Sequence, residues 1–139
     1  MRNEERLSRD WVFPGTKGFE HRIGGLEKDV KSGNISHDGP NHQLMVNLRQ
    51  EKLARVADFI PELEVIGEVS AELLVVGWGG TYGHLFTAIE EMNQAGFKVA
   101  LAHFNYINPL PKNTQEVLSR YKKMVICELN LANSPGFYA

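Results

Sequence analysis

The residues of this chain that could most readily bind a ligand form a glycine-rich segment after an apolar run. The run is LLVVGW, residues 73–78, and it is followed by Gly79, Gly80, Thr81, Tyr82 and Gly83. Backbone N–H groups and a hydroxyl at the start of a helix can bind a phosphate group. The segment lacks a P-loop lysine, and its spacing is not the G-x-G-x-x-G dinucleotide pattern. We therefore favour a packing and domain-contact role, with phosphate binding as the alternative.

The histidines could ligate a metal or transfer protons, but their spacing supports neither role. One group lies near carboxylates and matches no compact zinc pattern, so we predict no metal site; it comprises His21, His37, His42, Glu20 and Asp38. His84 lies one turn into a predicted helix, where we favour a surface position over contact with a ligand or subunit. His103 lies in a predicted buried strand, which favours a hydrogen-bonded core residue. We predict no catalytic residue.

Composition and charge exclude several further classes. The single cysteine, Cys127, cannot form an internal disulfide or hold an iron–sulfur cluster, which fits a reducing, cytoplasmic setting best. We expect Cys127 to be buried in a strand. Lys plus Arg number 15 against 17 Asp plus Glu, and this balance gives no electrostatic case for nucleic acid or a membrane surface. No apolar run approaches the roughly 18 residues of a transmembrane helix.

The second half of the chain must position the glycine segment. Apolar runs at 73–78, 98–104 and 123–128 alternate with predicted helices at about 82–94 and 114–121, and 65–69 is a possible edge strand. Ala95-Gly96 is a helix stop signal. This alternation predicts an α/β fold with three α/β/α layers and a mainly parallel sheet. The turn containing Tyr106, Asn108, Pro109 and Pro111 should lie at the same carboxyl edge as the glycine segment.

The first half has no comparable pattern. From Met1 to about Asn47 the apolar residues are isolated among turn signals, which predicts an extended irregular connector. From about Leu44 to Phe59 the apolar residues recur at helical spacing, which predicts an amphipathic helix closed by Pro61. We therefore expect a connector over 1–62 and an α/β domain over 63–139.

Six motifs in order along the chain resemble the alpha subunit of 2-oxoacid:ferredoxin oxidoreductases, most closely the 2-oxoglutarate type. They are GTKGFEH around Thr16, GNISHD around Asn34, R-x-x-K-L from Arg49, VVGWGGTYG, YINPLP and VICELN. The resemblance spans nearly the whole chain and implies the carboxyl-terminal part of that subunit, a domain similar to the last domain of transketolase. It also implies that Thr16 to His21, including Lys17 and Glu20, lie near a neighbouring domain and the entrance of the active site.

The resemblance implies a complex that oxidatively decarboxylates 2-oxoglutarate to succinyl-coenzyme A and reduces ferredoxin. The family uses thiamine diphosphate, Mg, iron–sulfur clusters and coenzyme A. Its thiamine is held by the beta subunit and the amino-terminal domain of the alpha subunit, neither of which this chain contains. We therefore expect a chain that binds no cofactor, is inert alone, partners with the beta subunit and that missing domain, and is prone to self-association. A stand-alone module binding a phosphate-bearing ligand at the glycine segment is the alternative.

The carboxyl end departs from the family pattern. Family members continue ELNL with Gly-Gln, small and aromatic residues and then L-R-M, whereas this chain reads ANSPGFYA and stops. Loss of one base from a frame encoding LGQFAGFLRM can yield LANSPGFYA followed by a stop codon. We therefore expect a truncated domain with an accidental tail at 132–139, and an engineered end is the alternative.

Overall fold

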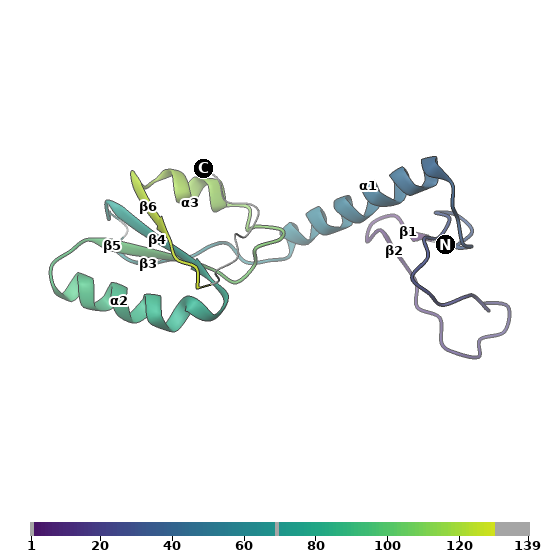
Figure 1. Ribbon diagram of the computed structural model, residues 1–139, viewed down its shortest axis with the longest axis horizontal. Coiled ribbons are helices and arrows are strands. Elements are labelled where there is room, and N and C mark those ends of the chain that lie inside the picture. The colour runs from purple at the N-terminus through teal and green to yellow at the C-terminus, as the bar shows by residue number, and fades with distance from the viewer. Residues whose placement is uncertain (1, 69, 130–139) are drawn as a thin grey trace. The chain divides into compact units, whose positions relative to one another are not determined.

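The computed structural model describes residues 2–68 and 70–129, which fall into two compact units divided between Val56 and Ala57 (Figure 1). No helix in these described ranges is long and apolar enough to cross a membrane. The predicted division at residue 62 and the transketolase-like assignment of residues 63–139 stay predictions.

The second unit is built on a four-stranded sheet in the order β3-β5-β4-β6. Its strands are β3 (Val65–Gly67), β4 (Leu73–Trp78), β5 (Val99–Phe104) and β6 (Lys123–Ile126). β4 pairs in parallel with β5 and β6, so that Gly77 lies opposite His103, whereas β3 pairs antiparallel with β5. The prediction of a mainly parallel sheet with an edge strand near residue 65 is confirmed.

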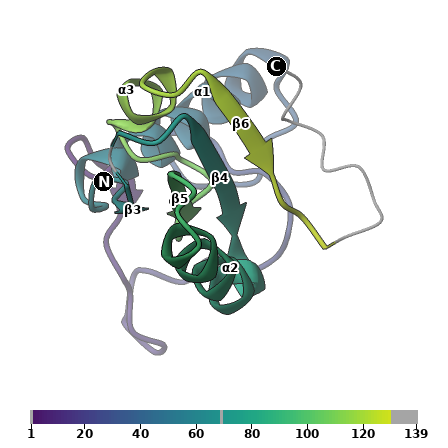
Figure 2. The same ribbon diagram turned by 90° about the vertical axis from the view of Figure 1, so that its left-hand side faces the viewer.

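Helices cover both faces of this sheet, which gives the predicted three layers. The short 3-10 helix η2 (Gly79–Thr81) leads from β4 into α2 (Tyr82–Gln94), and α3 (Thr114–Ser119) precedes β6. Figure 2 shows α2 and α3 on opposite sides of the sheet. Alternate residues of β5 therefore enter two cores: Leu101 packs with Ile89 of α2, while Ala102 packs with Val117 of α3. Since both faces are covered, β5 is almost wholly apolar.

Two asparagine side chains secure the connections in this unit. The amide of Asn93, near the end of α2, donates to Val99 O and accepts from Val99 N, both at 3.0 Å. Asn113 makes the same pair of bonds with Leu63, at 3.0 and 2.8 Å. Gly96, with a φ of 89°, ends α2 at the predicted stop signal, and Phe97 N donates back to Met92 O at 3.0 Å.

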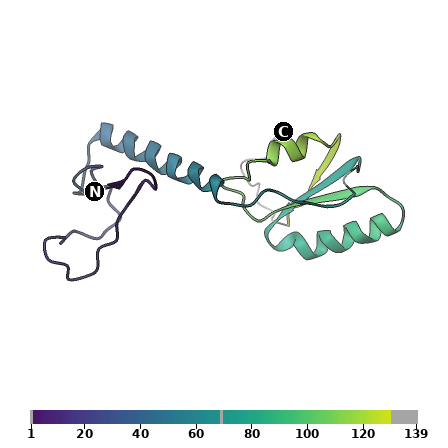
Figure 3. The same ribbon diagram turned by 180° about the vertical axis from the view of Figure 1, so that it is seen from behind.

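The first unit contains more structure than the sequence predicts. Strands β1 (Arg2–Asn3) and β2 (Ser8–Arg9) form an antiparallel hairpin, and Lys28 makes an isolated bridge with Ile35. Figure 3 shows an irregular segment between this hairpin and α1 (Gly39–Arg55). The expectation of loop throughout 1–47 is therefore wrong at the hairpin and at the start of α1.

Helix α1 begins at Gly39, earlier than the predicted start near Leu44. Asp38 is the N-cap, its Oδ2 accepts from Asn41 N at 2.8 Å, and Pro40 lies in the first turn, where proline is well tolerated. The residues Asp38-Gly39-Pro40 are typical of a turn, but the same residues are also a helix-start signal. The helix ends at Arg55, and the 3-10 helix η1 (Val56–Asp58) follows, so the predicted end at Phe59 is also late.

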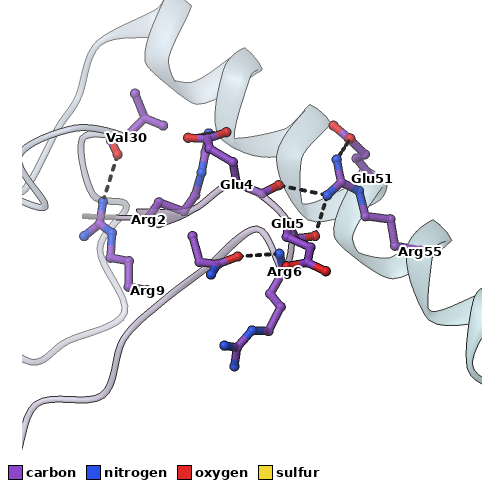
Figure 4. Close-up of polar contacts among 9 residues, drawn as sticks. Arg2, Glu4, Glu5, Arg6, Arg9, Val30, Glu51 and Arg55 are labelled. Atoms are coloured by element: carbon purple, nitrogen blue, oxygen red, sulfur yellow. Dashed lines mark hydrogen bonds and ion pairs between the residues drawn. The ribbon is translucent and has the colours of Figure 1, made fainter.

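Polar contacts attach the hairpin to α1 within the first unit. Arg55 Nη1 donates to the carbonyl oxygens of Glu4 and Glu5 at 2.9 and 2.5 Å, while its Nη2 pairs with Glu51 one turn earlier in the helix (Figure 4). The side chain of Asn41, which is 7% exposed, donates to Lys28 O and accepts from Val30 N. These bonds replace the apolar packing that the amphipathic-helix prediction implies for this unit.

The sheet edge at β6 corrects the expectation for Cys127. Every residue of β6 is exposed, and Cys127 follows the end of the strand with a partly exposed side chain. The reason is position: β6 is an edge strand, so it lacks the neighbours that bury β5. The tail at 132–139 and the end of the possible strand at Val69 lie outside the described residues.

Candidate functional site

A cleft of about 420 Å³ opens where β4 and β5 end, at the carboxyl edge of the sheet. Ligands commonly bind at this edge in open α/β sheets. The lining combines two acids, two tyrosines, a histidine and an asparagine with apolar residues: Pro61, Glu62, Leu63, Glu64, Ile66, Tyr82, His103, Asn105, Tyr106 and Pro111. We refer to it as the sheet-edge cleft.

The glycine segment is packed closely at its start and open further on. A Cβ at Gly77 would lie 2.3 Å from Leu85 Cδ1 and 2.8 Å from Thr81 Oγ1, so a larger residue between β4 and α2 would require these side chains to shift. Gly79 adopts a φ of 59°, and a Cβ at Gly79, Gly80 or Gly83 would meet nothing within 4 Å. Gly77 and Gly79 therefore have steric and conformational roles that require no ligand.

The hydroxyl of Thr81, which we considered as a phosphate ligand, is hydrogen-bonded within the fold. It is 6% exposed, and its Oγ1 donates to Trp78 O at 2.8 Å. His103 Nε2 lies 3.4 Å from the same oxygen. Because the hydroxyl proton is committed to Trp78 O, the oxygen can only accept from the imidazole. The pair is therefore not a histidine-activated nucleophile.

Tyr82 and His103 form the aromatic wall of the sheet-edge cleft. Their rings meet edge to face with centroids 5.1 Å apart, and Tyr82 also stacks on Phe86 at 5.7 Å. Burial is the main influence on His103 and lowers its pKa from the ordinary value of 6.5, against the opposing effect of hydrogen bonds with the backbone of Trp78 and Gly79. A neutral imidazole at neutral pH suits hydrogen bonding and aromatic contact in this wall.

The predicted residues of the second unit are distributed unevenly around this cleft. Tyr82 lines it, and so do Tyr106 and Pro111 of the predicted edge turn. His84 is exposed on α2, as we favoured, and Asn108 is exposed before a cis peptide bond with Pro109; neither lines the cleft. Their role as contacts stays a prediction.

The predicted residues of the first unit form a separate exposed loop. Thr16, Lys17, Glu20 and His21 are all exposed. Thr16 Oγ1 donates to Phe13 O at 2.8 Å, and His21 Nδ1 lies 2.8 Å from Phe19 O. Hydrogen bonds from backbone N–H groups at Glu20 and Gly18 lower the pKa of the Glu20 carboxyl. The loop is thus locally ordered by its own backbone.

Sequence reasoning missed part of the sheet-edge cleft. Glu62, Glu64 and Asn105 were not singled out, and His103 was assigned to the core, whereas its side chain is partly exposed and reaches the cleft. The available signal was position, because His103 and Asn105 lie where a parallel strand ends. Within the described ranges, no three His, Cys, Asp or Glu side chains are grouped to hold a metal ion.

Known proteins similar to this chain share one enzyme family. No family model matches the chain. It is 50% identical over 131 residues to the 2-oxoglutarate oxidoreductase subunit KorA of Mycobacterium tuberculosis, covering 94% of this chain and 20% of that protein. It is 36% identical over 101 residues to the alpha subunit of 2-oxoacid:ferredoxin oxidoreductase 1 of Aeropyrum pernix, covering 70% of this chain and 16% of that protein.

A solved structure is similar as well. The structure is of 2-oxoglutarate:ferredoxin oxidoreductase from Magnetococcus marinus with 2-oxoglutarate, coenzyme A and succinyl-CoA bound. The TM-score is 0.76 at 28% identity, and the match covers 94% of this chain and 23% of the other. The chain therefore spans only about a fifth of the length of the proteins it resembles.

Proposed function

The chain belongs to the alpha subunits of 2-oxoacid:ferredoxin oxidoreductases, and we propose that it is the carboxyl-terminal, transketolase-like segment of such a subunit. The observation that carries this proposal is 50% identity to the Mycobacterium tuberculosis subunit along 94% of the chain. Its role is architectural: it supplies a packed α/β unit and surfaces on which the other domains and the beta subunit assemble.

The parent complex converts a 2-oxoacid, here 2-oxoglutarate, to an acyl-coenzyme A and passes the electrons to ferredoxin. The names of the relatives support this assignment, including the 2-oxoglutarate, coenzyme A and succinyl-CoA of the Magnetococcus marinus structure. The family resemblance adds thiamine diphosphate, Mg and iron–sulfur clusters, and the complex operates in the cytoplasm.

The donor groups of this chain do not fit those metal-containing groups. An iron–sulfur cluster takes up to four cysteine thiolates, and the chain has one cysteine. The described residues offer no group of three metal-ligating side chains, and Thr81 Oγ1 is engaged by Trp78 O. We therefore infer that the chain alone is inert.

Exposed apolar side chains support an assembly role. Between the hairpin and α1, Trp11, Phe13 and Ile23 are 95%, 80% and 90% exposed. In the second unit, Met124, Val125 and Ile126 of β6 are each about half exposed, on both faces of the edge strand. We infer that these side chains contribute to interaction surfaces, which would favour self-association when the partners are missing.

The stand-alone alternative has less support. Of the groups in the glycine segment that could bind a phosphate, the Thr81 hydroxyl is buried and already hydrogen-bonded to Trp78 O. Gly77 and Gly79 also have sufficient steric and conformational reasons to be glycine.

The DNA around the coding sequence tests the parentage. We expect neighbouring sequence to encode the remaining parts of the alpha subunit and a thiamine-binding beta subunit. Flanking DNA that encodes neither would count against the proposal. An activity assay of the purified chain, with 2-oxoglutarate, coenzyme A and an artificial electron acceptor, should show no turnover, and turnover would contradict inertness.

A further inference from the structure

The first unit contains a second cleft, of about 760 Å³, between the hairpin, the 25–30 segment and α1. We refer to it as the basic cleft. Its lining joins basic and apolar side chains: Arg2, Leu7, Ser8, Arg9, Trp11, Gly25, Leu26, Glu27, Lys28, Val30, His42, Met45, Leu48, Arg49 and Lys52.

The lining carries five lysine and arginine side chains against a single acid, Glu27. The whole chain has a formal net charge of -2, so positive charge is concentrated here against the overall balance. A cleft lined by one sign of charge focuses its potential and attracts ions of the opposite sign. The cleft is therefore suited to an anion.

Some of this positive charge is used by the fold. Glu27 accepts from Arg49 Nη2 at 2.8 Å and lies 3.0 Å from His42 Nδ1, and these contacts, the Arg49 hydrogen bond first, lower the pKa of Glu27. Arg9 donates to the carbonyl oxygen of Asp29 at 2.7 Å. It also donates to the carbonyl oxygen of Val30 (Figure 4).

Among the five cations of the lining, Arg2 and Lys52 are the least engaged by the rest of the unit. Arg2 Nε and Nη1 are buried and have no hydrogen-bond partner within residues 2–68 and 70–129, while Nη2 makes only a 3.4 Å contact with the exposed Glu4. Lys52 has no ion pair within the same ranges. Buried donors without acceptors are rare in folded proteins, because they forgo hydrogen bonds with water. An acceptor brought into the cleft would satisfy them.

We propose that the basic cleft binds the phosphate group of a small molecule, with Arg2 and Lys52 as its principal ligands. A phosphate supplies several acceptor oxygens and matches the fork of donors on a guanidinium group. Leu7, Met45 and Leu48 provide an apolar wall beside these cations, and Trp11 is 95% exposed at the cleft and available for stacking. The assignment goes beyond the proposed function and is independent of it, because the ligand would bind the chain alone.

Calorimetric titration of the full chain with inorganic pyrophosphate tests the site. We expect saturable binding that weakens as NaCl is raised from about 0.05 to 0.5 M, since salt screens the attraction. R2Q and K52Q should each weaken binding by roughly tenfold or more. K31Q is the matched control, because Lys31 is exposed in the same unit and does not line the cleft.

A parallel titration with ADP distinguishes the two sources of a phosphate. Tighter binding of ADP, with quenching of Trp11 fluorescence in a W78F background, identifies a phosphate ester with a flat group; equal affinities identify the phosphate alone. Absence of saturable binding, or equal losses in K52Q and K31Q, would overturn the proposal. If R2Q fails to fold, K52Q still tests the proposal, because Lys52 is exposed on α1 and its substitution should not disturb folding.

Discussion

The side-chain amide of Asn113 hydrogen-bonds to both the N–H and the carbonyl group of Leu63, which lies 50 residues earlier in the chain. It accepts from Leu63 N at 2.8 Å and donates to Leu63 O at 3.0 Å. These two bonds join the segment before β3 to the residue that precedes α3. They therefore help to position Leu63 and its neighbours in the wall of the sheet-edge cleft.

The first prediction concerns this pair. N113A removes both bonds and leaves the N–H and carbonyl groups of Leu63 without these partners. Leu63 is only 6% exposed, so water cannot readily replace them. We expect the free energy of unfolding of the second unit to fall by about 1–3 kcal/mol. Urea denaturation followed by Trp78 fluorescence in a W11F background measures that unit, and Q115A on the exposed side of α3 is the control. Equal stability of N113A and Q115A would show that the hydrogen bonds between Asn113 and Leu63 do not stabilise the unit.

The second prediction separates two glycines of one segment. G77A places a methyl group against Leu85 and Thr81, which should cost about 1–3 kcal/mol. G83A enters open space within α2 and should leave stability unchanged or raise it by up to about 1 kcal/mol. The same fluorescence assay compares the two variants. A G77A protein as stable as G83A would contradict the packing role of Gly77.

The third prediction is a pH dependence from His103. Burial lowers its pKa in the folded state below the ordinary 6.5, so the unfolded chain binds more protons in the window between the two values. Stability from this residue is therefore complete above pH 6.5 and is lost as the pH falls below it. We expect the urea midpoint to decline from pH 7.5 to 5.5 more steeply in the W11F background than in the same background with H103Q. Parallel curves would show that His103 does not sense pH.

The fourth prediction tests the start of α1. D38A removes the acceptor of the Asn41 N–H and should destabilise the helix start by about 0.5–2 kcal/mol, whereas D38N keeps a capping oxygen and should lose much less. Hydrogen exchange of the Asn41 amide, measured by NMR, reports this bond directly. Unchanged protection in D38A would mean that the cap contributes nothing.

The second unit could be predicted closely from sequence because each of its patterns has one physical solution. Leu73 to Trp78 is too short for a buried helix and too apolar for a surface strand, and Gly96 provides the left-handed position that ends α2. The bounds of β4 and α2 match the prediction. The exposure of Cys127 could not be predicted, since it depends on β6 lying at the edge of the sheet.

The first unit was harder to predict from sequence because it is organised by polar contacts and not by apolar periodicity. Asn41 bonds to Lys28 and Val30, and Arg55 bonds to the backbone of Glu4 and Glu5. No spacing rule reveals partners so distant in sequence. In the second unit, the contact between Tyr82 and His103 could not be predicted from spacing, because it follows from the register of β4 and β5.

The central proposal is that this chain is an assembly segment of an alpha subunit. The direct measurement mixes the purified chain with a beta subunit of the family and with the Mycobacterium tuberculosis subunit from which the 131 matching residues have been removed. Size-exclusion chromatography with light scattering then detects any complex. We predict a stoichiometric complex that contains this chain. Elution of the chain apart from those partners at every concentration tested would contradict the proposal.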